Sequence, residues 1–80
     1  MTDIPALLNG YPVIASKPVG DDYFIVAVFR GADYPEQPFV VATWWPVLGP
    51  SWSQGDYIAT LSELAQIYEE RITLAQERSR

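Results

Sequence analysis

The 80-residue sequence contains neither cysteine nor histidine. Without cysteine, disulfide bonds and thiolate nucleophiles or ligands are excluded. Without histidine, Ser–His and Cys–His nucleophile pairs and histidine-rich metal sites are excluded as well. The five glycines follow neither the Walker A nor the G-x-G-x-x-G spacing, so no phosphate-binding loop is predicted. We therefore expect no catalytic residues, no cofactor and no metal ion.

The acidic residues offer only weak candidate sites. Asp21 and Asp22 are adjacent, but a turn is the better interpretation, because Asp is favoured in turns and Ca²⁺ needs six or more oxygen ligands. Glu69 and Glu70 are expected on the solvated face of a helix. An enzyme that used carboxylates would need two of them to converge. Their spacing predicts no such pair, so we expect a protein that is not an enzyme.

Positive charge is also scarce. Ten carboxylates face five Lys and Arg residues, which gives a net charge of −5 and a surface that repels nucleic acids and anionic membranes. The longest apolar run, Tyr23 to Phe29, is far shorter than the roughly 20 residues that cross a bilayer. The segment MTDIPALLNG lacks the features of a signal peptide. We expect a cytoplasmic protein that binds neither nucleic acids nor membranes.

Apolar residues, by contrast, are abundant: 49% of the chain is hydrophobic and 14% is aromatic, enough for one folded domain over residues 1–80. Three to four strands are predicted, over residues 11–19, 23–30, 39–45 and 51–58. Pro12 and Pro18 place the first strand at an edge of the sheet. The second and third strands are apolar on both faces, which is typical of central strands. The last strand is expected to break near Gly55.

Two helical segments are predicted. Thr60-Leu-Ser-Glu63 is a capping box, and the helix that it begins runs to about Arg78. Residues 3–10 are expected to form a short helical turn that Asp3 caps and Asn9-Gly10 ends. The apolar stripe of the long helix consists of Leu61, Leu64, Ala65, Tyr68, Ile72 and Ala75. The predicted fold class is α+β, an antiparallel sheet with one C-terminal helix on a face and a short N-terminal helical turn.

This arrangement has more apolar sheet surface than one helix covers. The other face must be covered by the N-terminal segment and loops, by a second copy of the chain, or by a partner, and an uncovered face would be an interaction site. In a strand, Trp44 and Trp45 point to opposite faces. Ile67 and Leu74 lie off the helix stripe, at a broadened core edge or at a contact surface. The candidate interface residues are Trp44, Trp45, Trp52, Tyr57, Ile67, Arg71 and Leu74.

Two functions from different classes follow. The first is a non-enzymatic protein-interaction module, a homodimer through the second sheet face or a binder of a basic target. The alternative is a small-ligand binder that uses Trp52, Tyr57 and one of Trp44 or Trp45. Nucleic-acid mimicry is a further alternative, which needs carboxylates arrayed on one surface.

Four short motifs resemble small orphan proteins of unknown function that plasmids, integrative elements and phages carry. The motifs are Tyr23-Phe-Ile-Val-Ala27, Phe39-Val-Val-Ala-Thr-Trp-Trp45, Gly55-Asp-Tyr57, and Leu64-Ala65 through Tyr68 to Arg71. Many such proteins have His where this sequence has Asp56. The resemblance implies an accessory or inhibitor protein of a mobile element and supplies no active site.

Overall fold

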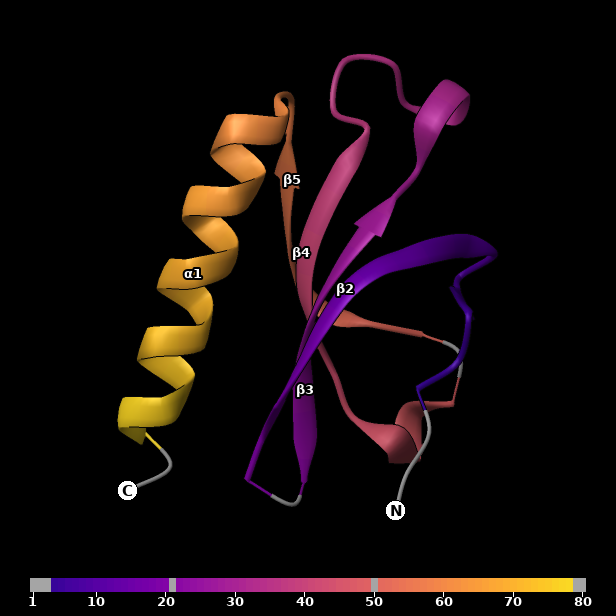
Figure 1. The fold of residues 1–80 in the computed structure, drawn as a ribbon. Helices are drawn as coiled ribbons and strands as arrows, with labels where there is room; N and C mark the ends of the chain where they lie inside the picture. Colours follow the sequence, from indigo (N-terminus) through magenta and orange to yellow (C-terminus); the bar gives the residue numbers. More distant parts are fainter. Residues whose placement is uncertain (1–3, 21, 50, 79–80) are drawn as a thin grey trace.

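The fold is an antiparallel sheet that curls beside one long helix (Figure 1). The computed structural model describes residues 4–20, 22–49 and 51–78. Within them the sheet order is β1-β2-β3-β4-β5, and each strand is antiparallel to its neighbour. The elements are β1 (Leu7–Leu8), β2 (Tyr11–Val19), β3 (Tyr23–Phe29), η1 (Gly31–Asp33), β4 (Phe39–Trp44), η2 (Pro46–Leu48), β5 (Ser53–Ile58) and α1 (Leu61–Arg78). The predicted α+β class is confirmed, but the sheet has five strands rather than three to four.

The additional strand, β1, occupies the segment for which a helical turn was predicted, so that prediction is wrong. Leu7 and Leu8 pair with the beginning of β2 through a two-residue hairpin at Asn9-Gly10. Both turn residues have positive φ, 52° at Asn9 and 84° at Gly10. Asn-Gly is the preferred sequence for such hairpins, and a helix of six or seven residues is marginal in any case. Asp3, the predicted cap, lies outside the described residues.

The predicted break in the last strand is a β-bulge within β5. Val41 pairs with Asp56 and Thr43 pairs with Ser53, so one more residue lies between the partners on β5 than on β4. Gln54, within the bulge, has a φ of 53°. A Cβ atom at Gly55 would come within 3.1 Å of the Trp52 indole and of Val40. Glycine at this position lets the backbone lie directly against core side chains, which would have to shift to admit a larger residue.

One apolar cluster lies between α1 and the sheet. Its buried members are Val19, Ile25, Ala27, Val41, Ile58, Leu64 and Ala75. The helix begins as predicted: the backbone N–H of Glu63 donates to Thr60 Oγ1 at 3.3 Å. The reciprocal bond differs, since the Thr60 hydroxyl donates to Glu63 Oε1 at 3.0 Å. Leu61 and Ala65 of the predicted stripe are exposed, whereas Ile67 packs against this cluster.

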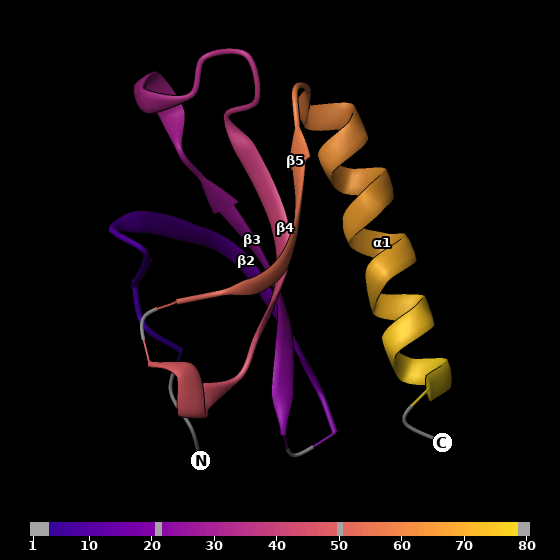
Figure 2. The same ribbon diagram turned by 180° about the vertical axis from the view of Figure 1, so that it is seen from behind.

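A second apolar cluster covers the opposite face of the same sheet. It contains Leu8, Val26, Val28, Val40, Ala42 and Trp44, with Ile4, Tyr11, Val13, Phe24 and Trp52 packed against it. Figure 2 shows the N-terminal segment and η2 on the side of the sheet away from α1. Val26, Val28, Val40 and Ala42 are all 0% exposed. Of the three covers expected for this face, the structure has the first, the N-terminal segment and loops, because the sheet twists and its ends close over that face.

Candidate binding groove

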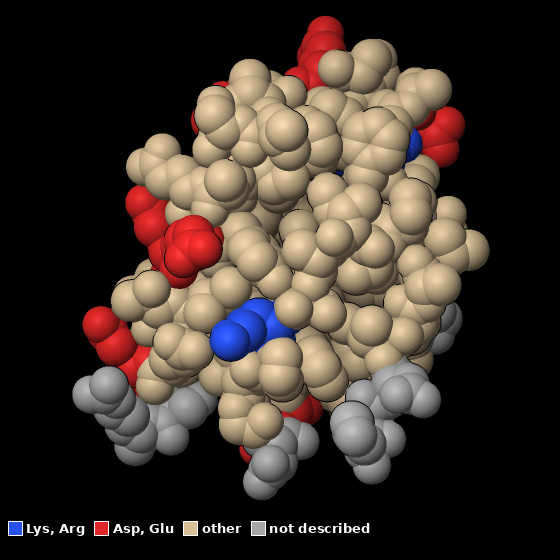
Figure 3. All heavy atoms as spheres, in the orientation of Figure 1, with Lys and Arg blue, Asp and Glu red and all other residues tan. Residues whose placement is uncertain are grey.

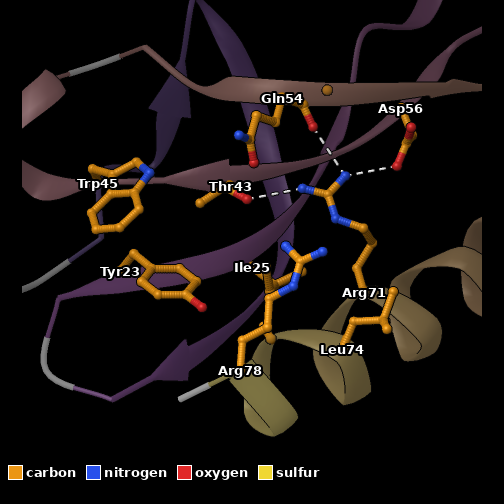
Figure 4. Close-up of a pocket in the computed structure, with 11 residues that line it drawn as sticks. Tyr23, Ile25, Thr43, Trp45, Gln54, Asp56, Arg71, Leu74 and Arg78 are labelled. Carbon is orange, nitrogen blue, oxygen red and sulfur yellow. Dashed lines mark hydrogen bonds and ion pairs between the residues drawn. The ribbon is translucent and has the colours of Figure 1, made fainter.

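A groove of about 550 Å³ lies between α1 and the helix-facing side of the sheet (Figure 4). We call it the α1–β4 groove. The sheet supplies one wall and the second half of the helix supplies the other. It is lined by Tyr23, Ile25, Thr43, Trp45, Gln54, Gly55, Asp56, Arg71, Leu74, Ala75 and Arg78.

Arg71 fixes one end of this groove by joining the helix to two strands. Its Nη1 atom donates to Asp56 Oδ2 at 2.7 Å and to the carbonyl oxygen of Gln54 at 2.9 Å. Its Nη2 atom donates to Thr43 Oγ1 at 2.9 Å, and a longer bond of 3.4 Å joins Nη1 to the Val41 carbonyl. The rigid fork of the guanidinium suits several acceptors at once. Arg71 is therefore a fixed part of the wall.

An aromatic pair forms the other end. The ring of Trp45, which directly follows β4, lies 4.6 Å from the ring of Tyr23 in β3, with an interplanar angle of 32°. Figure 4 shows the side chains of Gln54 and Arg78 reaching into the space between this pair and Arg71. The groove thus combines an apolar aromatic end with polar donors, a combination common in binding sites.

A second depression, of about 410 Å³, adjoins the groove on the outer side of Arg71. We call it the α1–β5 depression. It is lined by Asp56, Tyr57, Ile67, Glu70, Arg71 and Leu74. Asp56, Arg71 and Leu74 line both spaces, so the two adjoin at one ion pair.

Most of the predicted contact residues meet at these two spaces. Trp45, Arg71 and Leu74 line the groove, and Tyr57 and Ile67 line the depression. Ile67 also packs against the helix-side cluster, so it lies at a broadened core edge. Leu74 is half-exposed, as expected for a contact surface.

Trp44 and Trp52 lie elsewhere, on the opposite face of the sheet. Trp44 is buried, and its Nε1 atom donates to the carbonyl oxygen of Gly49 at 2.6 Å. Trp52 packs beside Tyr11, with ring centroids 6.5 Å apart. The prediction that Trp44 and Trp45 point to opposite faces is confirmed. Trp52 and Trp45 are therefore separated by the sheet and do not share a site.

Several groove residues were not predicted as site residues from the sequence. Tyr23, Thr43 and Gln54 were read only as parts of strands, Asp56 as a turn and Arg78 as the end of a helix. The pairing of Asp56 with Arg71 depends on the bulge and on the placement of the helix, which no local spacing reveals. Both residues do occur in the motifs of the proposed resemblance, and this was the one signal that linked them.

Arg30 is a second residue whose environment the sequence did not indicate. Its guanidinium carbon lies 3.6 Å from the centroid of the Tyr34 ring and 4.5 Å from that of Tyr57. Its Nη2 atom donates to the Gln37 carbonyl at 2.8 Å, and its backbone N–H donates to the Pro38 carbonyl at 2.6 Å. Cation–π contacts of this kind stabilise a desolvated guanidinium. Arg30 thus fastens the loop that contains η1 to the end of the sheet.

The carboxylates near these features have structural partners. Asp56 is paired with Arg71, and Asp33 accepts a hydrogen bond from the Tyr11 hydroxyl at 3.0 Å. Among residues 4–20, 22–49 and 51–78, no group of three or more acidic side chains could hold a metal ion. Within the same ranges, no helix is long and apolar enough to cross a membrane.

Comparison with protein-family models, with curated proteins and with solved structures gave no match. The resemblance to small proteins of mobile elements therefore stays a prediction.

Proposed function

We propose that this protein is a non-enzymatic binding module that contacts a protein partner through the α1–β4 groove and the α1–β5 depression. The observation that carries the proposal is that these two spaces adjoin at a fixed ion pair and share three lining residues. Half-exposed apolar side chains border them: Trp45 is 37% exposed and Leu74 50%. Trp, Tyr and Arg are the residue types enriched at the centres of protein interfaces.

The proposed contact surface replaces the second sheet face, because that face is covered within one chain. A homodimer through the second face is therefore no longer part of the proposal. The role as an accessory or inhibitor protein of a mobile element, and the cytoplasmic location, stay within it, supported by the resemblance and by the acidic charge.

Mimicry of a nucleic acid has less support. Figure 3 shows the carboxylates of one face dispersed mainly toward its margins, with basic side-chain atoms in its lower middle. A mimic of a phosphate backbone needs regularly spaced negative charge on one surface. On that face the acidic groups have no such array.

Site-directed photo-crosslinking tests the proposed surface. A photoreactive residue at Leu74 would face the shared edge of both spaces, whereas one at Gln76 would lie nearly opposite on the same helix. In extract from the cell that encodes the protein, we expect one discrete adduct from position 74 and none from position 76. The same adducts from both positions, or none from position 74, would contradict the proposal. An adduct of twice the chain mass would identify a second copy as the partner.

Small-ligand binding is a second candidate, because the groove volume lies within the roughly 300–1,000 Å³ of typical ligand pockets. It would use Trp45 and Tyr23 rather than Trp52. Quenching of tryptophan fluorescence by members of a metabolite panel, absent in a Trp45→Phe variant, is the expected result. If no class of metabolite changes the fluorescence, this candidate is removed.

A further inference from the structure

Among the residues that the structure describes, Arg78 is the cation that lines the α1–β4 groove without forming an ion pair. Of the cations that the structure describes, Arg30 is buried between two tyrosine rings and Arg71 is paired with Asp56. Arg78 lines the groove and points into it (Figure 4), and Lys17 is the strand partner of Ile25, another lining residue. Within the described ranges neither Arg78 nor Lys17 forms an ion pair.

Two acidic positions lie near the groove, one at each of its ends. Asp22 is exposed and precedes Tyr23 in the chain, and Asp56 is neutralised by Arg71. Arg78 is thus, among the described residues, the groove cation whose charge no carboxylate neutralises. A carboxylate that entered the groove would meet Arg78 first.

The α1–β5 depression, which adjoins the groove, contains a side chain of the opposite charge. Glu70 lines the α1–β5 depression, where its Oε1 atom accepts a bond of 3.3 Å from Gln66. Between Glu70 and Arg78 lie the Arg71–Asp56 pair and the half-exposed side chain of Leu74. Along the two adjoining spaces the charge therefore changes from negative at Glu70 to positive at Arg78. The residues between them are apolar or form an ion pair with each other.

From this polarity we infer the chemistry of the partner, and the inference rests on the function proposed above. The occupant is an extended segment of a partner protein with a carboxylate toward Arg78, an apolar side chain beside Leu74, and a basic side chain toward Glu70. An extended segment fits better than a compact molecule, because the two spaces adjoin and charge complementarity is needed in both.

The helix sets the spacing of the two charges in such a segment. Glu70 and Arg78 are eight positions apart in α1, which is about 12 Å at 1.5 Å per residue. An extended chain covers about 12 Å in roughly four residues, at 3.3 Å each. The acidic and basic residues of the segment should therefore be about four positions apart, with the apolar residue between them.

Three blocked pentapeptides test this inference on the full chain. The first is acetyl-Glu-Gly-Phe-Gly-Lys-amide, and in the other two either its Glu or its Lys is replaced by Gln. Binding is measured by NMR shift titration of the ¹⁵N-labelled protein. We expect the first peptide to bind about two- to fivefold more tightly than either control, the range for partly exposed ion pairs. The Trp45 indole signal should shift in each titration.

Two protein variants assign each preference to its residue. Arg78→Gln should abolish the preference for Glu over Gln in the peptide and leave the preference for Lys. Glu70→Gln should do the reverse. Glu36→Gln, an equal charge change on the exposed loop after η1, should leave both preferences intact. Both preferences should also weaken as the salt concentration rises.

Equal affinities for the three peptides, or preferences that survive both variants, would overturn the inference. This failure is distinct from failure of the proposed function. A discrete adduct from position 74 without any peptide preference would support the proposed binding surface but contradict the inferred chemistry of the partner. Loss of that adduct would remove the surface itself.

Discussion

Arg71 should stabilise the fold mainly through its neutral acceptors and only slightly through its ion pair. In Arg71→Met the aliphatic stem stays but every guanidinium bond is lost. Thr43, which is 5% exposed, would lose the partner of its hydroxyl, and an unsatisfied buried hydroxyl costs about 1–3 kcal/mol. The carbonyl oxygens of Gln54 and Val41 would lose a charged donor as well. We expect a loss of about 2–4 kcal/mol in the free energy of unfolding.

Asp56→Asn is the matched variant that removes only the ion pair. The Asp56 side chain is 53% exposed, and exposed ion pairs contribute about 0–1 kcal/mol. The carboxamide can still accept a hydrogen bond from Arg71. We therefore expect a loss of less than about 1 kcal/mol, several times smaller than for Arg71→Met.

Urea denaturation followed by tryptophan fluorescence measures both variants. A domain of this size has a total stability of roughly 4–12 kcal/mol, so the difference between the variants is well resolved. The m-values should agree with that of the unmodified protein, because the same surface is exposed on unfolding. Equal losses for the two variants would refute the reasoning, as would a loss below about 1 kcal/mol for Arg71→Met.

Three further predictions concern the cores and the helix. Leu8→Ala should lower the free energy of unfolding by about 2–4 kcal/mol and raise the binding of a hydrophobic dye, because Leu8 helps to cover the second sheet face. Unchanged dye binding would contradict that role. Thr60→Ala should lower the free energy of unfolding, measured by urea denaturation, by about 1 kcal/mol, because it removes the helix cap. An unchanged free energy of unfolding would show that the cap does not stabilise the fold. Burial, and then the charge of Glu69, raise the pKa of Tyr68 above 10.0, so the folded state holds this proton more tightly than the unfolded state. Stability should therefore be unaffected by Tyr68 below about pH 10 and decline above it, and urea midpoints from pH 8 to 11 should decline less in Tyr68→Phe.

The parts of the fold that local sequence determines were predicted. The strands β3 and β4 were visible as apolar runs, and α1 was visible from its capping box and its periodicity. The opposite directions of Trp44 and Trp45 followed from strand geometry alone. These features depend on neighbours a few positions apart, so a single sequence is sufficient to find them.

The covering of the second sheet face was not predictable in this way. It depends on how strongly the sheet twists and on Leu8, which belongs to a strand of only two residues. The groove was missed for a similar reason, since Asp56 meets Arg71 only after the bulge in β5 and the position of α1 are fixed. Long-range geometry of this kind has no local signature.

Because of the bulge in β5, the side of the sheet to which each β5 side chain points depends on the number of residues in that strand. Side chains alternate along a strand, so the count of residues decides which side each one takes. Deleting one residue at Gln54 would reverse every β5 side chain before that point relative to those after it. Trp52 would then turn from the interior toward the groove, and a cavity would open where its indole had been. Insertions and deletions in this strand should therefore be tolerated far less well than substitutions.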